Sequence, residues 1–322
     1  MYKPLLSGDS KPFFNYLKEN RKNESNIIPD LKYQSQLAKT LVEKASLLNS
    51  FFESVFVIDD SQTPTMRSGA IPSDNSDLIV SEQGVVGLLE KLDRNKTGGL
   101  DLLTGRILSL FAPIIAPCLT RIYQYSLDSC TIPSIWKVAR VIPVYKKGSK
   151  EMPSNYRPIS LTCITCKTLE HIVSSMIHDH LNSYNILHDS QHGFRKERSC
   201  DSQLVHTINE LALNLDRKVV TDVVILDFSK AFDTVNHCKL LLKLNHYGIN
   251  KKLIQWIQDF LTGRGQFVSV DGAKSPLCKI WSGVPQGSVL GPLLFLLYVN
   301  DLPDLIDSEC WLFADDTLLF NS

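Results

Sequence analysis

Two adjacent carboxylates near the end of the chain are the residues best suited to chemistry. Asp315 and Asp316 lie between apolar runs, with Trp311 and Leu312 before them and residues 318–320 after them. Acidic side chains in an apolar stretch cost free energy unless a partner neutralises them, and carboxylate oxygens are ligands that suit Mg²⁺. The pattern predicts a hairpin with both acids at its tip. It also fits an acidic surface turn that does no chemistry.

A third acid, Asp227, ends the β-branched run at residues 223–226. The run predicts a buried strand that presents the acid at its carboxyl end. Two-metal phosphoryl transfer needs carboxylates from separate strands that converge on ions roughly 3.5–4 Å apart. Asp227, Asp315 and Asp316 would bind two Mg²⁺ ions, which Mn²⁺ could replace. One ion would lower the pKa of an attacking hydroxyl, and the other would hold a triphosphate and stabilise the leaving pyrophosphate.

Five segments, in a fixed order, resemble the motifs of the reverse transcriptase of a non-LTR (LINE-type, jockey-like) retrotransposon. They are residues 155–161 (NYRPISL), 191–195 (QHGFR), 226–233 (LDFSKAFD), 283–292 (GVPQGSVLGP) and 313–316 (FADD). Each alone is a weak match, but together they make the resemblance specific. It implies an RNA-directed DNA polymerase, in which a primer 3′-hydroxyl attacks the α-phosphate of a deoxynucleoside triphosphate. The implied partners are an RNA template, a DNA primer and deoxynucleoside triphosphates.

The same resemblance implies roles for residues around the acids. Lys146 and Arg157 would grip the triphosphate, since a guanidinium presents a planar fork of donors to phosphate. Phe232 would pack under the sugar and exclude a 2′-hydroxyl by overlap. Phe228 would offer its backbone carbonyl to a metal, and the amide of Gln286 would orient the nucleotide or the template.

Blander roles stay open for some of these residues. Arg157 could form a structural ion pair, Phe232 could be ordinary core, and Asp233 could cap the helix that follows it. The net charge is zero, so positive charge is local. Because they lie beside the motifs, we expect phosphate contacts from two basic clusters, which are Lys137, Arg140, Lys146, Lys147 and Lys150, and Arg195, Lys196 and Arg198.

The hydrophobic patterns predict an α+β fold in which helices pack on one face of an antiparallel sheet. By resemblance this is the fingers and palm of a right-hand polymerase, preceded by a helical N-terminal segment. The expected division is a helical linker-type segment (1–60), a flexible linker (61–76), a helical extension of the fingers (77–134) and the fingers and palm (135–322). We expect helices at 37–56, 79–91, 107–130, 163–184, 202–215, 236–247, 251–261 and 289–300, and strands at 138–145, 219–227, 267–270 and 277–281, besides the last hairpin.

Related reverse transcriptases continue into the rest of the palm and a helical thumb, so we expect this chain to be truncated before the thumb. Because chain ends fray unless docked, residues 317–320 should be less protected than residues 223–227. One alternative is therefore a truncated, inactive copy that retains nucleic-acid or nucleotide binding. Another is a metal-dependent nuclease, although such an enzyme would need neither Arg157, Phe232 nor Gln286 in these roles.

Composition and the lengths of the apolar runs indicate the class of protein and its cellular location. The 322 residues are 43% hydrophobic, enough for a packed core. No signal peptide is apparent, the longest apolar run is too short to span a bilayer, and the eight cysteines have no paired spacing. These features predict an intracellular protein that is not bound to a membrane. They do not separate nucleus from cytoplasm, and they say nothing of oligomeric state.

Overall fold

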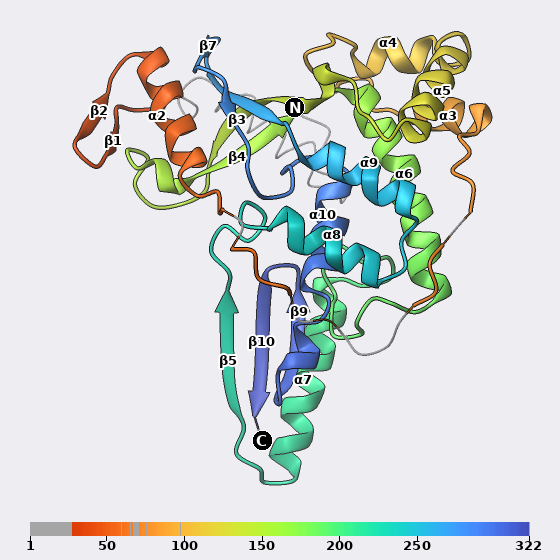
Figure 1. Ribbon diagram of the computed structural model, residues 1–322. Helices are drawn as coiled ribbons and strands as arrows, with labels where there is room; N and C mark the ends of the chain where they lie inside the picture. Colours follow the sequence, from red (N-terminus) through yellow and green to blue (C-terminus); the bar gives the residue numbers. More distant parts are fainter. Residues whose placement is uncertain are drawn as a thin grey trace, which may run out of the picture.

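The computed structural model describes residues 28–58, 60–64, 66, 71–74, 76–96 and 98–321. Within them the chain forms a mixed α/β structure (Figure 1). One sheet has three strands in the order β5-β10-β9, both pairs antiparallel. Its strands are β5 (Asp222–Asp227), β10 (Asp316–Asn321) and β9 (Glu309–Phe313). The expected hairpin around the two adjacent acids is therefore confirmed.

A second sheet lies at the other end of the molecule (Figure 1). Its strands are β4 (Tyr156–Leu161), β3 (Val138–Tyr145), β6 (Gly265–Val270) and β7 (Ala273–Lys274), with β8 (Cys278–Lys279) also paired to β6. β3 and β6 run parallel, so the expectation of a purely antiparallel sheet is wrong here. Asp271 and Gly272, with φ of 45° and 88°, make a tight turn, and the returning strand begins earlier than expected, at Ala273.

The described part of the first sixty residues is only partly helical. Residues 37 and 38 belong to a hairpin of β1 (Leu31–Tyr33) and β2 (Gln36–Ala38), not to the expected helix. Helix α2 (Leu41–Glu53) begins after Thr40, which forms a capping box with Glu43. The apolar periodicity predicted a helix that begins at residue 37. The capping box at Thr40 instead fixes the start of the helix at Leu41. This helix shares a buried cluster with the second sheet that includes Phe51, Phe52, Val141, Tyr156 and Val268.

The other helices lie close to the predicted ranges. They are α3 (Glu82–Glu90), α4 (Gly105–Leu110), α5 (Ala112–Asp128), α6 (Ile164–Ser183), α7 (Cys200–Asp216), α8 (His237–His246), α9 (Lys251–Leu261) and α10 (Leu290–Val299). The helix expected at 107–130 is two helices that meet at Phe111, and a proline at the start of α5 is tolerated there. In the described part of the chain, no helix is both long and apolar enough to cross a membrane.

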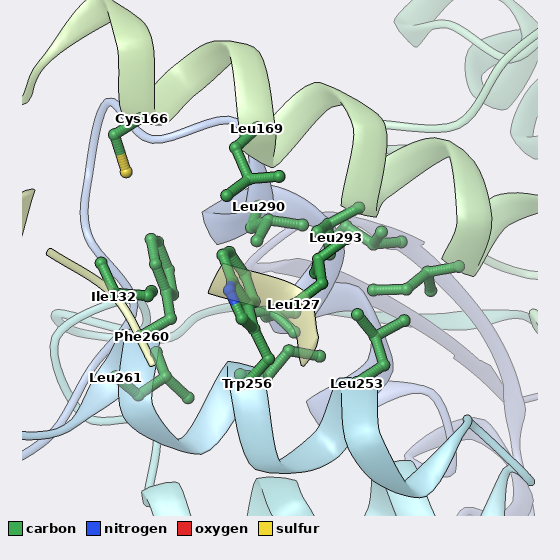
Figure 2. Packing of buried hydrophobic residues seen from close by; sticks show 14 of the residues in the cluster. Leu127, Ile132, Cys166, Leu169, Leu253, Trp256, Phe260, Leu261, Leu290 and Leu293 are labelled. Carbon is green, nitrogen blue, oxygen red and sulfur yellow. The ribbon is translucent and has the colours of Figure 1, made fainter. Parts of the chain in front are cut away.

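The main core is built by α5, α6, α8, α9 and α10. Figure 2 shows Trp256 and Phe260 of α9 facing Leu169 of α6 and Leu290 of α10. Trp256 is fully buried, and its indole N–H donates to Ser126 Oγ at 2.9 Å. Because α10 is anchored in this core, the segment 283–292 that leads into it has a rigid support.

The expectation that the strand ending at Asp227 is buried is wrong. All six residues of β5 are exposed, Ile225 by 75%, whereas β9, at the other edge of the sheet, buries Cys310 and Leu312. β10 lies between β5 and β9 and buries Thr317 and Phe320. The last strand of the chain is thus the central strand of this sheet, and the segment expected to be buried is the more exposed one.

Candidate active site

Strand register brings the predicted acids together. Asp227, the last residue of β5, lies directly opposite Asp316, the first residue of β10. Directly opposed residues of an antiparallel pair project to the same face, with Cα atoms about 4.5–5.5 Å apart. Asp315 sits in the turn between β9 and β10, after Ala314, whose φ is 57°. All three acids therefore meet at one end of the β5-β10-β9 sheet.

The acids repel one another. The pKa of Asp316 is raised by burial, then by the charges of Asp315 and Asp227, and Lys146 opposes the rise. Repulsion of this kind is relieved when a cation binds between carboxylates. Within the residues that the structure describes, no three His, Cys, Asp or Glu side chains are gathered closely enough to hold a metal ion. The sheet end thus offers oxygen ligands of the right chemistry, without a closed cage.

The turn that carries Asp315 is braced by the segment 191–195. Oε1 of Gln191 accepts from the backbone N–H of Gly193 at 2.8 Å and of Ala314 at 3.0 Å. Gly193 packs so tightly that a Cβ there would lie 2.3 Å from the nitrogen of Ala314. Only glycine fits this approach.

Cations face the acids from the second sheet. Lys146 follows β3, and its backbone N–H donates to the carbonyl of Asn155 at 2.8 Å, two residues before Arg157 of β4. Lys146 and Arg157 both lower the pKa of Lys230, after the larger effect of burial. Arg157 is exposed and has no ion-pair partner among the described residues, which disfavours the structural ion pair. Lys146 therefore acts on Asp316 directly, and the charges of Lys146 and Arg157 both act on Lys230.

Phe232 is held between two other rings. It stacks on Phe295 of α10, with centroids 4.5 Å apart and planes 17° apart, and meets Phe194 edge-on at 6.0 Å. It is half-buried, so one part of the ring belongs to the core and another faces outward. Phe228 is 40% exposed beside Asp227. The two aromatics thus differ, because Phe232 is fixed by packing and Phe228 is not.

Gln286 is held by both its backbone and its side chain. Its carbonyl accepts from the N–H of Ser160 on β4 at 2.9 Å, and its Nε2 donates to Asp233 Oδ1 at 2.9 Å. Gly287 has φ of 103°, and a Cβ there would lie 2.8 Å from the carbonyl oxygen of Ser160. Asp233 does not cap the following helix, as one alternative had it. Asn236 caps α8 instead, because its side chain accepts from the N–H of Lys239 at 3.0 Å.

Comparison with known protein families identifies the family of the segment that carries these residues. The family described as reverse transcriptase (RNA-dependent DNA polymerase) matches residues 144–322, which include all three acids, Lys146, Arg157 and Gln286. The chain belongs to the reverse transcriptase family.

Its relatives are polymerases of non-LTR retrotransposons. The RNA-directed DNA polymerase from mobile element jockey of Drosophila melanogaster is 32% identical over 247 residues, covering 74% of this chain and 27% of the relative. The probable RNA-directed DNA polymerase from transposon BS of Drosophila melanogaster is 28% identical over 288 residues, covering 83% of this chain and 30% of the relative. The chain therefore belongs to the non-LTR retrotransposon branch of the reverse transcriptase family, and it spans less than a third of the length of these relatives.

Some basic residues of this reverse transcriptase serve its structure instead of facing the acids. Lys137 pairs with Asp259 at 2.6 Å, and Arg198 pairs with Asp189 at 2.8 Å. Arg195 donates to the carbonyl of His188 at 2.8 Å. Each of these three side chains has at least one donor engaged within the protein, and the expected phosphate contacts stay a prediction. Charge clustering in a sequence does not reveal such partners, because they lie far along the chain or on the backbone.

Gln191, Phe194 and Lys230 were not singled out from the sequence. Each lies inside a reverse transcriptase motif, which is the signal that could have drawn attention to them. Their contacts are tertiary: Gln191 with Ala314, Phe194 with Phe232, and Lys230 with the charges of its neighbours. No local pattern in the sequence encodes these contacts.

Proposed function

We propose that this chain carries a polymerisation site that joins a deoxynucleotide to a DNA primer on an RNA template. The observation that carries the proposal is the register that sets Asp227 opposite Asp316, beside Asp315. Lys146 supplies positive charge that acts on Asp316, and the charges of Lys146 and Arg157 act in turn on Lys230. Acids beside cations suit a substrate that bears both a triphosphate and a reacting α-phosphate.

The three carboxylates fit the Mg²⁺ ions that such chemistry uses. Their oxygens are hard ligands. The pKa of Asp316 is raised by burial and then by the charges of Asp315 and Asp227, a repulsion that bound cations would relieve. Asp227, Asp315 and Asp316 would hold the ions, and the carbonyl of Phe228 could add a ligand. When bound, the ions activate the attacking hydroxyl and stabilise the charge of the leaving pyrophosphate. Mn²⁺ could take the same ligands.

The remaining side chains bind and orient the substrate in this proposal. Lys146, Arg157 and Lys230 hold the triphosphate by charge and hydrogen bonds. Phe232, fixed against Phe295, blocks the space that a 2′-hydroxyl would occupy. The primer 3′-hydroxyl loses its proton and attacks the α-phosphate, the new phosphodiester bond forms, and pyrophosphate leaves. The second sheet and α2 would then form the fingers, and the β5-β10-β9 sheet the palm.

Primer extension on a homopolymeric RNA template with Mg²⁺ tests the proposal. The double variant Asp315→Ala, Asp316→Ala should lose roughly 1,000-fold in rate, which is about 4 kcal/mol of lost charge stabilisation. Asp216→Ala, at the exposed end of α7, is the matched control and should extend like the native chain. A native chain that folds and binds nucleotide without extending would favour a copy that retains binding alone. Extension that survives the double variant would refute the assigned acids.

A further inference from the structure

Asp233 is a buried carboxyl group apart from the three acids at the sheet end. Its side chain is 8% exposed, and its Oδ1 accepts from Nε2 of Gln286 at 2.9 Å. It follows the turn after β5, in the same motif as Phe232. Through this hydrogen bond, the buried carboxyl contacts the half-buried side chain of Gln286, for which the resemblance implies a role in orienting the nucleotide or the template.

The backbones that carry this pair are locked together. The N–H of Val284 donates to the carbonyl of Phe232 at 2.8 Å, and Ser282 Oγ donates to the carbonyl of Asp233 at 2.8 Å. A Cβ at Gly283 would lie 2.8 Å from Cα of Asp233, so the two segments are in direct backbone contact. With both main chains fixed, the Asp233–Gln286 hydrogen bond has little freedom to rearrange.

An ionised carboxylate can only accept hydrogen bonds, so the NH₂ end of the Gln286 amide must face Asp233. Burial raises the pKa of Asp233, while the hydrogen bond from Gln286 and the charge of Lys230 oppose that rise and favour the ionised form. The other end of the amide, Oε1, is therefore turned away from Asp233. No hydrogen bond joins this oxygen to another described residue.

The space behind the pair is too small for substrate. A cavity of about 30 Å³ is bordered by Asp233, Gln286 and Arg264. That volume holds about two water molecules, far less than a nucleotide. Arg264 is 2% exposed, and its Nε and Nη2 have no protein partner in the described part of the chain, so the cavity suits water. Asp233 therefore acts on substrate through the side chains that it faces, which are Gln286 by a hydrogen bond and Lys230 by charge.

We infer that Asp233 is a positioning residue, which fixes the Gln286 amide with its oxygen toward the substrate so that the site accepts a hydrogen bond from a sugar hydroxyl. The inference rests on the proposed function, because it takes the substrate to be a nucleotide with its template. Two sources share this chemistry: the 3′-hydroxyl of the incoming deoxynucleotide and the 2′-hydroxyl of the RNA template. The inference assigns a role to the last acid of the motif at 226–233.

The amide orientation can be measured without any catalysis. In the full chain labelled with ¹⁵N, the side-chain NH₂ signal of Gln286 is assigned by its loss in Gln286→Glu. We expect its protons to exchange with solvent roughly tenfold more slowly than those of an exposed glutamine, because they are bonded to a charged group. Asp233→Asn should move the signal and remove most of that protection. Asp271→Asn, the same change at an exposed turn, should leave it unaltered.

Hydroxyl selection is measured by binding, with the same three proteins. The native chain and Asp271→Asn should bind a deoxynucleoside triphosphate, or an RNA template, roughly tenfold more tightly than the 2′,3′-dideoxy or DNA counterpart. Asp233→Asn should reduce one of these preferences to about twofold or less, and the preference that falls identifies the hydroxyl. A merely structural role would weaken all ligands alike and leave both ratios unchanged.

Several results would overturn the inference. One is an NH₂ signal of Gln286 that is the same in Asp233→Asn as in the native chain. Another is a native chain that does not discriminate between hydroxyl-bearing ligands and their counterparts. If the amide signal behaves as expected but no nucleotide or template binds, the orientation stands, hydroxyl recognition is refuted, and the proposed function fails independently.

Discussion

Gln191 and Ala314 are joined by one hydrogen bond, 3.0 Å from the backbone N–H of Ala314 to Oε1 of Gln191. The same oxygen also accepts from the N–H of Gly193, so a single buried amide ties the segment at 191–195 to the turn that presents Asp315. Ala314 has a left-handed backbone, which a non-glycine residue adopts at some cost. The hydrogen bond offsets part of that cost and holds the acid in place.

Replacing Gln191 should therefore make the turn that carries Asp315 less rigid and leave the binding of nucleotide unchanged. In Gln191→Leu, two buried N–H groups lose their acceptor, at about 1–3 kcal/mol each. We expect a lower thermal unfolding temperature and an extension rate reduced by roughly tenfold to a hundredfold, with the KM for nucleotide little changed. Gln191→Glu keeps the acceptor and should recover most of the rate. A Leu variant that raises KM and leaves the rate intact would contradict this role.

Phe232 should decide which sugar is accepted. Its ring is fixed by Phe295 at 4.5 Å, so it cannot swing aside for a larger substrate. We expect Phe232→Val to raise the incorporation of ribonucleotides relative to deoxynucleotides by roughly tenfold or more, since a steric barrier is removed. Competition between the two triphosphates in one extension reaction measures the ratio. Phe228→Val is the matched control, because that ring is 40% exposed and makes no ring contact among the described residues. An unchanged ratio would mean that Phe232 is only a core residue.

The sequence predicted the parts of the site that depend on local patterns. The hairpin around Asp315 and Asp316, the strand that ends at Asp227 and the apolar helix before Asn300 follow from side-chain periodicity and turn residues. The meeting of Asp227 with Asp316 was expected from chemistry, and the strand register provides it. Periodicity therefore located the acids, and the chemistry of two-metal transfer grouped them.

The sequence could not predict which strand lies at the edge of a sheet. The run at 223–226 is as apolar as a buried strand, yet Val224 is 49% and Ile225 75% exposed. Composition describes what a strand could bury, whereas burial depends on which neighbours the fold supplies. The partners of Lys137, Arg198 and Asp233 were hidden for the same reason, because each contact joins segments that are distant in the chain or folded by tertiary packing.

Backbone amides of β10 should exchange with solvent more slowly than those of β5, although β10 lies nearer the end of the sequence. β10 has hydrogen-bonded neighbours on both sides and buries Thr317 and Phe320, while β5 is exposed along its length. We expect the backbone amides of β10 to exchange roughly tenfold or more slowly than those of β5. Mass spectrometry of peptic fragments that cover each strand measures the difference. Faster exchange in β10 than in β5 would mean that the end of the chain frays despite its central position.

Lys230 should contribute to nucleotide binding although burial lowers its pKa. Burial lowers the pKa of Lys230, and the charges of Lys146 and Arg157 lower it further because the three positive groups repel one another. A triphosphate would relieve this repulsion. Lys230→Gln should therefore raise the dissociation constant for nucleotide by roughly tenfold, as the loss of a charge-assisted hydrogen bond implies. Lys251→Gln, at the start of α9, is the control. Equal affinity in the native chain and both variants would remove Lys230 from the site.

His192 should make the folded chain sensitive to acid. Burial, followed by the charges of Arg198, His206 and Arg195, lowers the pKa of His192 to about 4. In the unfolded chain its pKa is about 6.5, so between pH 4 and 6.5 the unfolded state binds the extra proton. Stability should therefore be full above about pH 7 and fall as the pH drops toward 4, by about 1–3 kcal/mol for this group.

Urea unfolding of the native chain and of His192→Asn, at intervals between pH 4.5 and 7.5, measures that contribution. The variant loses the contacts of the imidazole with Ser202 and Arg198, so it should be less stable at pH 7. Its stability should nevertheless depend less steeply on pH, because the titrating group is gone. The difference between the two curves isolates His192 from the carboxylates that also titrate in this range. Parallel curves would show that the imidazole keeps its ordinary pKa in the folded chain.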